Sequence, residues 1–434
     1  MFILYDVIFI LFAIGVLPAY IFKRKFHQGF LMRLGIFSDE QRKHLAGKRP
    51  IWLHAVSVGE ALASKALLEE LHKAYPDTQM VISTVTPTGN KIARKIAQEK
   101  DFVFYLPFDV SFIVKKVVRL INPRLVIIAE TEIWPNVIRC LYKRAIPIIT
   151  VNARISDGSF KGYRLIKFLI KPVMNTINAF CVQTETDANR LVALGVIDEK
   201  IKITGNMKFD TSALRASDPA IREEEYRKKL GLGERERLLV AGSTHPGEEE
   251  IILEVYKKLL NEFSDLKLLI APRHPERAKE LAQLVLSCNL DAVFISKLRG
   301  TIEEGRGTKV FILDTIGQLK DFYAASDIVF IGGSLIKKGG QNILEPAALA
   351  KPIVCGAYMF NFRDITALFL KNHACIMAHN KEELFKNIAD LLRNPKERDA
   401  LGARAKALIA QNQGATMRNM EYIKKLMPRG RKNA

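Results

Sequence analysis

The sequence predicts an α/β protein with two doubly wound parallel sheets in tandem, and three observations support this fold class. Short apolar segments rich in β-branched residues alternate with helical segments over most of the chain, as in parallel sheets with crossover helices. A polar, highly charged stretch at about residues 213–235 interrupts the alternation once and is expected to be a linker. The 434 residues, 48% of them hydrophobic, are enough for two cores of ordinary size. We expect a ligand cleft between the two domains.

The amino terminus, residues 1–22, is apolar except for Asp6. It is expected to be an uncleaved membrane-anchor helix, because no small-residue cleavage site follows it. A helix over residues 7–22 would extend about 24 Å, short of a hydrocarbon core of about 30 Å, so spanning requires Asp6 at the headgroups. The basic residues of 23–49 predict that the rest of the chain lies on the cytoplasmic side, attracted to anionic lipid. The alternatives are a segment in the membrane interface and a buried core helix with a solvated basic loop.

The first domain is expected to span residues 23–212 and to form a Rossmann-like sheet. Helical spacing is clear in residues 61–75, where Leu62, Ala66, Leu67 and Leu71 fall on one face. The candidate strands of this domain are residues 51–55, 80–84, 102–106, 125–129, 146–151, 180–183 and 201–204.

The second Rossmann-like domain is expected to span residues 236–412 and to repeat the alternation. Its candidate strands begin at Leu238 and continue with residues 266–270, 310–313, 328–331, 353–355 and 375–377. The chain is expected to end, over residues 413–434, in a helix at about 418–427 and a basic tail. No shorter period repeats along the sequence, which excludes a solenoid.

Residues 328–349 predict a strand, a glycine-containing loop and a helix. Asn342, followed three residues later by Glu345, resembles a capping box at the helix start. Gly339 and Gly340 would let backbone amides and the positive end of the helix dipole approach a phosphate, and Glu345 could accept hydrogen bonds from ribose hydroxyls. The alternative is structural: the glycines form a turn and Glu345 only caps the helix.

Ligands of open parallel sheets bind beyond the carboxyl ends of the strands, so polar residues at these ends are site candidates. Glu60 begins a helix after a turn that contains Ser57 and Gly59. Its carboxylate would either cap the helix or act as general base on an acceptor hydroxyl. Glu130 and Glu132 flank another strand end and could hold sugar hydroxyls or serve only as helix-start acids.

Other strand ends carry further candidates. Lys208 could neutralise a carboxylate or a phosphate, or be an ordinary surface lysine. Arg273 is a candidate phosphate ligand, and Pro272 a shape element beside a base. His245 and His274 lack a third ligand at metal-binding spacing, so no metal site is expected. The remaining candidates of the second domain are Ser243, Thr244, Ile316, Gly317 and Gln318.

The composition limits the partners of the chain. A net charge of +20 implies an acidic partner, which could be nucleic acid, an anionic membrane or a phosphorylated substrate. Nucleic acid is not expected, because no basic face interleaved with aromatic residues is evident. The five cysteines are scattered and mostly lie in apolar runs, so we expect buried thiols in a reducing compartment.

Several motifs, taken together, carry a resemblance to a known family. They are HAVSVGE at 54–60, TPTG at 86–89, LPFD at 106–109, ETEIWPN at 130–136, NAR at 152–154, GNMKFD at 205–210, AGSTH at 241–245, APRHPER at 271–277 and NILE at 342–345. From its amino terminus to about residue 365, the chain resembles the 3-deoxy-D-manno-octulosonic acid (Kdo) transferases of lipopolysaccharide biosynthesis.

The resemblance implies a GT-B glycosyltransferase on the cytoplasmic side of the inner membrane. Such an enzyme transfers Kdo from CMP-Kdo to the lipid A precursor lipid IVA, without a metal or other cofactor. Glu60 matches the proton acceptor of the family. The residues that match its CMP-binding segments are Pro272, Arg273, Ile316, Gly317, Gln318, Asn342, Ile343, Leu344 and Glu345.

The sequence departs from the family pattern at three positions. Gln341 stands where a histidine is frequent, Ile343 where a proline is frequent, and Gln318 where a glutamate is frequent. These changes would remove a side-chain contact to phosphate and leave the helix-start amides in place. The alternative within the same fold is another GT-B nucleotide-sugar enzyme that acts on a different membrane lipid.

Overall fold

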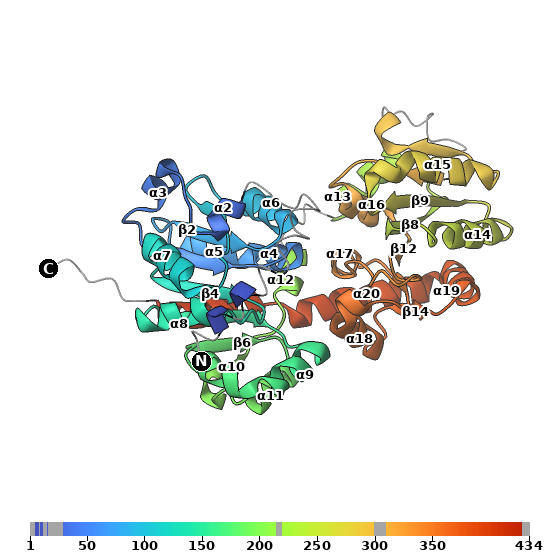
Figure 1. Cartoon of the computed structure of the whole chain (residues 1–434). Helices are drawn as coiled ribbons and strands as arrows, with labels where there is room; N and C mark the ends of the chain where they lie inside the picture. The colour runs from blue at the N-terminus through green and yellow to red at the C-terminus, as the bar shows by residue number, and fades with distance from the viewer. Residues whose placement is uncertain are drawn as a thin grey trace. The chain divides into compact units, whose positions relative to one another are not determined.

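The computed structural model describes residues 5–7, 9–11, 15, 29–213, 219–298 and 310–427. The chain divides into two compact units, residues 1–211 with 412–434, and residues 212–411. Each unit contains one seven-stranded parallel sheet with helices packed on it (Figure 1). The predicted α/β class with two parallel sheets is therefore confirmed.

The first sheet has the strand order β3-β2-β1-β4-β5-β6-β7. The chain builds outward from β1 to β3 and then returns to place β4 beside β1, so the winding direction reverses between these two strands. In doubly wound sheets, ligands bind at the carboxyl ends of the strands next to this switch point. The strands are β1 (Ile51–His54), β2 (Met80–Thr84), β3 (Phe102–Tyr105), β4 (Leu125–Ala129), β5 (Ile148–Ala153), β6 (Ala179–Val182) and β7 (Ile201–Ile203).

Helices cover both faces of this sheet. Successive residues of a strand point to opposite faces, so Trp52 packs into one core with Phe104 and Ile138, while Leu53 packs into the other with Leu67. The helices are α2 (Phe30–Arg33), α3 (Asp39–Leu45), α4 (Val58–Ala63), α5 (Lys65–Ala74), α6 (Pro87–Ile96), α7 (Ser111–Ile121), α8 (Pro135–Lys143), α9 (Asp157–Leu165), α10 (Lys167–Met174), α11 (Glu185–Ala193), α12 (Lys208–Ala213) and α21 (Ala415–Leu426), with a 3₁₀ turn η1 (Asp198–Lys200).

The second sheet has the strand order β10-β11-β9-β8-β12-β13-β14, with its switch point between β8 and β12. Its strands are β8 (Arg237–Thr244), β9 (Leu266–Pro272), β10 (Ala292–Phe294), β11 (Val310–Ile312), β12 (Ile328–Ile331), β13 (Ile353–Gly356) and β14 (Ile376–Ala378). Its helices are α13 (Pro219–Lys229), α14 (Glu249–Leu260), α15 (Ala278–Ser287), α16 (Leu319–Ala325), α17 (Leu344–Ala348), α18 (Arg363–Lys371), α19 (Lys381–Arg393) and α20 (Pro395–Asn412), with 3₁₀ turns η2 (Pro275–Arg277), η3 (Ile295–Lys297) and η4 (Phe360–Phe362).

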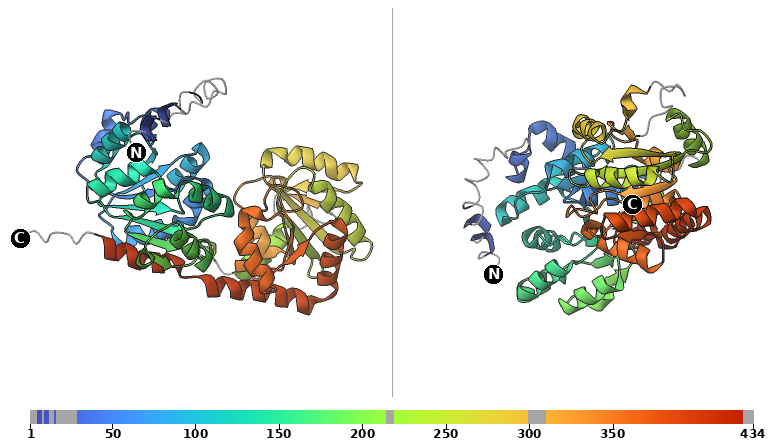
Figure 2. Two further views of the ribbon diagram at one scale, coloured as in Figure 1. Left: turned by 60° about the horizontal axis from the view of Figure 1, so that its bottom comes forward. Right: turned by 90° about the vertical axis from the view of Figure 1, so that its right-hand side faces the viewer.

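The last helix, α21, packs against the first unit (Figure 2, left). The carboxylate of Asp210 accepts hydrogen bonds from the amides of Gly414 at 2.7 Å and Thr416 at 2.6 Å. The guanidinium of Arg418 donates to the carbonyl of Thr204 at 2.8 Å. The helix is therefore capped and held by residues about two hundred positions earlier in the chain.

The expected strands are all present, and three local predictions were wrong. Strand β10 was missed because its residues are only half-buried and form a short edge strand. The segment 61–75 is not one helix: α4 ends at Ala63 and α5 begins at Lys65, and Leu62 is 43% exposed instead of lying on the buried face. The charged stretch read as linker contains α13, which packs on α16 through a hydrogen bond from the Tyr226 hydroxyl to Asp321 at 3.1 Å.

The predicted anchor, residues 1–22, lies largely outside the described residues. Within the described ranges, no helix has the length and apolar character needed to cross a membrane. Asp6, which was expected at lipid headgroups, instead accepts hydrogen bonds from the amide of Ser111 at 3.1 Å and the side chain of Asn136 at 2.7 Å.

Candidate functional site

Glu60 lies in the first turn of α4, beyond the carboxyl end of β1, and is only 7% exposed. One carboxylate oxygen accepts from the amide of Val56 at 2.7 Å, and the other accepts from the Ser57 hydroxyl at 2.8 Å. Ser57 is the N-cap of the helix, and its hydroxyl accepts from the Glu60 amide at 3.5 Å. The carboxylate therefore stabilises the loop, and each oxygen keeps a lone pair for a further donor.

The three predicted carboxylates of the first unit come together at its switch point. Glu60 follows β1, and Glu130 and Glu132 follow the neighbouring strand β4. Burial, and then the charge of Glu130, raise the pKa of Glu60. Burial, and then the charges of Glu60 and Glu130, raise the pKa of Glu132 to about 7. Within this carboxylate cluster (Glu60, Glu130, Glu132), Glu60 and Glu132 therefore hold a proton more tightly than ordinary glutamates do.

Two residues near the carboxylate cluster were not predicted as site residues. His54 ends β1, and its ring lies edge-on to Trp134 at 6.3 Å between centroids. Burial lowers the pKa of His54 to about 4, so the ring is neutral at pH 7, and its Nδ1 lies 2.8 Å from the Ser83 hydroxyl. Burial, and then the charge of Glu132, raise the pKa of Tyr163. The sequence could have indicated His54, because it is a polar residue at the end of an apolar strand. Tyr163 lies on α9, and no sequence pattern indicated it as a site residue.

The two remaining candidates of the first unit differ in position. A Cβ added to Gly59 would meet no heavy atom nearer than the Ser57 Oγ, at 3.9 Å, so its neighbours do not require a glycine there. Lys208 begins α12 beyond β7, which is three strands from β4 in the sheet. Asn152 fixes the preceding turn by accepting from the Met207 amide at 3.0 Å. Lys208 therefore follows a turn that is held at the carboxyl end of β5, the strand next to β4.

In the second unit, three loops converge beyond β8, β9 and β12. The Arg273 amide donates to the carbonyl of Thr244 at 2.9 Å. The rings of His245 and His274 lie 6.3 Å apart between centroids, and His245 Nε2 is 3.4 Å from the side-chain amide of Gln341. These contacts place the AGSTH, APRHPER and glycine-rich segments side by side.

Glu345 lies in the first turn of α17, and its pKa is raised by burial. A hydrogen bond from the Asn342 side chain, at 3.1 Å, opposes this rise, followed by the charges of Lys320 and Arg273. Two basic side chains therefore surround the predicted nucleotide-binding carboxylate.

The predicted capping box was wrong in its details. The N-cap of α17 is Ile343, and Asn342 lies one residue earlier, where its side chain accepts from the Leu344 amide at 3.1 Å. This contact is an Asx turn, which precedes the helix instead of closing its first turn. Leu344 is buried within the helix.

Gly339 and Gly340 are favoured by their backbone conformation and lie close to neighbouring side chains. Both have positive φ, 98° and 70°. A Cβ at Gly339 would lie 2.3 Å from the Asn361 side chain, and one at Gly340 would lie 2.1 Å from the Met359 sulfur. The Gly340 amide donates to the carbonyl of Gly333 at 2.9 Å. The structural alternative, in which these glycines form a turn, accounts for both.

The earlier part of the same loop binds a carboxylate that the sequence analysis missed. Glu248 is fully buried, and it accepts from the amides of Gly333 at 2.6 Å, Ser334 at 3.0 Å and Leu335 at 2.9 Å. Burial raises its pKa, and these three amides oppose the rise. The amides that follow β12 are thus engaged by the protein itself. Nothing local to the sequence around Glu248 indicates this partner, which is 85 residues away.

The other candidates of the second unit line the ends of its strands. Ser243 has a φ of 59°, and its carbonyl would lie 2.4 Å from a Cβ at Gly332, so this approach requires the glycine. Pro272 ends β9 and is buried. Ile316 is 84% exposed, Gly317 has a φ of 98°, and Gln318 is the N-cap residue of α16. These three residues lie just before α16, the helix that carries Lys320 and packs against α17.

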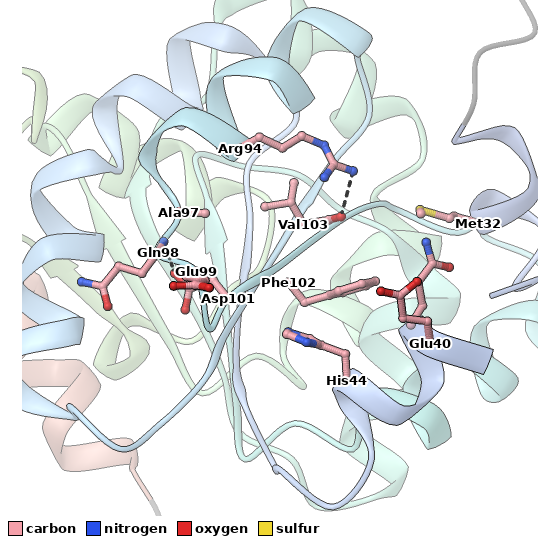
Figure 3. Close-up of a pocket in the computed structure, with 11 residues that line it drawn as sticks. Met32, Glu40, His44, Arg94, Ala97, Gln98, Glu99, Asp101, Phe102 and Val103 are labelled. Atoms are coloured by element: carbon pink, nitrogen blue, oxygen red, sulfur yellow. Dashed lines mark hydrogen bonds between the residues drawn. The ribbon is translucent and has the colours of Figure 1, made fainter. Parts of the chain in front are cut away.

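A separate pocket of about 450 Å³ lies at the β3 edge of the first sheet (Figure 3). It is lined by residues of α3, α6 and β3, among them His44, Arg94 and Phe102. Its lining includes no residue that the sequence analysis proposed for the site. Among the described residues, no group of three or more His, Cys, Asp or Glu side chains is arranged to hold a metal. All five cysteines are free thiols.

Comparisons with known proteins agree with this geometry. Residues 28–211 match the family model of 3-deoxy-D-manno-octulosonic-acid transferase (kdotransferase), and residues 222–408 match that of the glycosyl transferases group 1. The chain is 34% identical over 380 residues to a 3-deoxy-D-manno-octulosonic acid transferase of Haemophilus influenzae, covering 87% of each chain. It is 32% identical over 430 residues to that of Chlamydophila psittaci, covering 98% of this chain and 96% of the relative.

A solved structure of UDP-GlcNAc 2-epimerase from Neisseria meningitidis, bound to UDP-GlcNAc, shares the fold. The TM-score is 0.58 at 12% identity, over 87% of this chain and 100% of the epimerase. The two parallel-sheet units therefore form a GT-B-like glycosyltransferase fold. By the family model and by its relatives, the chain belongs to the 3-deoxy-D-manno-octulosonic acid (Kdo) transferases and is a glycosyltransferase of lipopolysaccharide synthesis.

Proposed function

We propose that this enzyme is an inverting transferase that moves Kdo from CMP-Kdo to lipid IVA, adding one or more Kdo units, with Glu60 as general base. The observation that carries the proposal is the environment of Glu60. It is a buried carboxylate at a switch point, with neighbouring carboxylates and a free lone pair on each oxygen. Such a group is able to take the proton of an acceptor hydroxyl as that hydroxyl attacks the sugar.

The proposed step is a single displacement. The acceptor oxygen bonds to the anomeric carbon of Kdo, the bond from that carbon to the CMP phosphate breaks, and the phosphate leaves with the electron pair. The acceptor proton passes to Glu60. Inversion follows because attack and departure occur on opposite faces of the carbon.

We assign the nucleotide to the second unit, beyond β8, β9 and β12. Arg273 is exposed and lies close enough to Glu345 and His245 to affect the pKa of both. A guanidinium there would balance the negative charge of the phosphate, and the Glu345 carboxylate could accept from ribose hydroxyls. The engagement of Gly333, Ser334 and Leu335 by Glu248 leaves phosphate binding to Arg273 and the start of α17.

We also propose that the enzyme works at the cytoplasmic face of the inner membrane, held there by its amino-terminal segment. Leu165, the last residue of α9, is 82% exposed, and Phe168, in the first turn of α10, is 72% exposed. The same two helices carry the basic residues Lys161, Arg164, Lys167 and Lys171. Apolar side chains within a basic surface favour contact with anionic lipid, which is where a lipid acceptor would be found.

The test is transfer from CMP-Kdo to lipid IVA in detergent with EDTA present, with products identified by mass. Addition of one or more Kdo units would support donor, acceptor and metal independence together, and would give the number of units. Loss of transfer in EDTA that Mg²⁺ restores would refute the metal-independent mechanism. Binding of CMP without transfer to lipid IVA would show that lipid IVA is not the acceptor.

The second candidate is a nucleotide-sugar enzyme of the same fold that uses another donor and another membrane lipid. A UDP-GlcNAc 2-epimerase shares the fold, so a UDP-sugar is the alternative donor to test. Use of a UDP-sugar but not CMP-Kdo, in the same mass assay, would select this alternative.

A further inference from the structure

Helices α7 and α8 of the first unit begin without a side-chain cap from their own N-cap residue. The N-cap residues of α7 and α8 are Val110 and Trp134, and neither provides a side-chain hydrogen bond to its helix. The first amides of a helix have no partner within the helix, and carboxylates are favoured there by the helix dipole. Both helices therefore need acceptors from elsewhere.

Two aspartates provide these acceptors. Asp109 accepts from the amides of Asn136 at 3.1 Å and Val137 at 2.9 Å, at the start of α8. Asp6 accepts from the amide of Ser111 at 3.1 Å, at the start of α7, and also from the Ser111 hydroxyl. Asp6 is 105 residues from Ser111 in the sequence.

Further contacts join these two caps. The side-chain amide of Asn136 donates to Asp6 at 2.7 Å and to the carbonyl of Asp109 at 2.6 Å. The Tyr5 hydroxyl donates to Asp109 at 3.0 Å. Burial, together with the nearby charge of Asp6, raises the pKa of Asp109 to about 6, although the hydrogen bonds oppose the rise. The positive ends of two helices stabilise the paired negative charges.

Aromatic contacts complete the attachment. The ring of Phe9 lies 6.1 Å from that of Tyr5 and 6.5 Å from that of Phe108, between centroids, and it packs on the core of the unit. Val7 and Leu11, in contrast, are 47% and 63% exposed. One side of the segment thus faces the domain, and the other side presents apolar residues.

We propose that Tyr5 and Asp6 form a latch that fixes the amino-terminal segment on the starts of α7 and α8, and so orients its exposed apolar side toward a lipid surface. The polar residue inside an otherwise apolar segment then has a defined role: Asp6 caps α7. The orientation toward lipid rests on the membrane location proposed above, whereas the latch itself does not.

The latch is tested by hydrogen–deuterium exchange of the full-length protein in detergent, at single-residue resolution. Asp6→Ala is compared with wild type and with Asp39→Ala, a matched control that removes an exposed aspartate of α3. We expect exchange of the Ser111 amide to accelerate by about fivefold or more in Asp6→Ala, the factor for loss of one capping hydrogen bond. The Val137 amide, which Asp109 holds, should change less, and Asp39→Ala should leave both unchanged.

A second variant distinguishes loss of a single contact from a general folding defect. Tyr5→Phe removes only the hydroxyl that donates to Asp109, so it should accelerate exchange at Asn136 and Val137 more than at Ser111. Unchanged exchange of the Ser111 amide in a folded Asp6→Ala protein would overturn the latch.

Binding to vesicles of phosphatidylethanolamine and phosphatidylglycerol separates the two proposals. If the latch orients the segment, Asp6→Ala should bind these vesicles several-fold more weakly than wild type and Asp39→Ala. Altered exchange with equal vesicle binding would keep the latch and reject its orienting role. Failure of the wild-type protein to bind vesicles would instead reject the membrane location and the orientation toward lipid, and leave the exchange result valid.

Discussion

Glu60 in the first unit and Glu248 in the second are both glutamates buried beside a loop that follows a strand, and burial raises the pKa of both. Their neighbours differ. Glu248 accepts from three backbone amides, so its charge is balanced by donors that cannot move away. Glu60 accepts from one amide and one hydroxyl and lies near two other carboxylates.

Burial alone therefore does not identify a reactive carboxylate. A carboxylate surrounded by fixed donors stabilises a loop, and its replacement should cost stability. A carboxylate with neighbouring negative charges and free lone pairs is ready to take a proton, and its replacement should cost rate. Substitutions at four positions test this division.

Glu60→Gln should lower the rate of Kdo transfer by about 10²- to 10⁴-fold, the range typical of a positioned general base. The amide keeps the size of the side chain, so CMP binding and thermal stability should stay close to wild type. Rates are measured by product mass, and CMP binding by calorimetry. Near-normal transfer by the folded variant would remove Glu60 from the base role.

Glu248→Ala should lower the free energy of unfolding of the second unit by roughly 3 kcal/mol, because three buried amides lose their acceptor. Urea denaturation followed by circular dichroism measures this. Glu250→Ala, which removes an exposed glutamate of the same helix α14, is the control and should have little effect. Equal stability of the two variants would contradict the structural role of Glu248.

Arg273→Ala should weaken binding of CMP and raise the KM for CMP-Kdo by roughly tenfold, as expected for loss of a charged hydrogen bond to a solvent-accessible phosphate. The turnover number should change less. Lys279→Ala removes a nearby exposed positive charge on α15 and serves as the control. If both variants lose affinity equally, the effect is one of net charge and Arg273 is not a ligand.

Glu130→Gln should shift the pH dependence of transfer. Transfer requires ionised Glu60, so activity falls as the pH drops through the pKa of Glu60, and the charge of Glu130 raises that pKa. Removing this charge should therefore move the acidic limb of the profile to lower pH, by about one unit or less. Glu185→Gln, on the exposed start of α11, should leave the limb in place. A limb that stays fixed in Glu130→Gln would argue that another group titrates.

Much of this architecture could be predicted from the sequence. Strands of parallel sheets are buried on both faces, so in the sequence they are continuous apolar runs, such as residues 125–129 and 328–331. The site candidates followed from the same reasoning, since polar residues just after such runs lie at one edge of the sheet. That edge brings Glu60 and Glu130 together because β1 and β4 are neighbours. The short, half-buried β10 lacked this signal.

The residue pattern alone thus predicts the fold class, all strands but β10, and the carboxylates that follow the strands. Which polar groups satisfy one another is set by the folded chain: Asp6 pairs with Ser111, Asp210 with Gly414, and Glu248 with Gly333. Each pair joins residues between 85 and 204 positions apart. A cap or a loop needs an acceptor but does not specify where in the chain it comes from, and that choice depends on which strands and helices the folded chain places side by side.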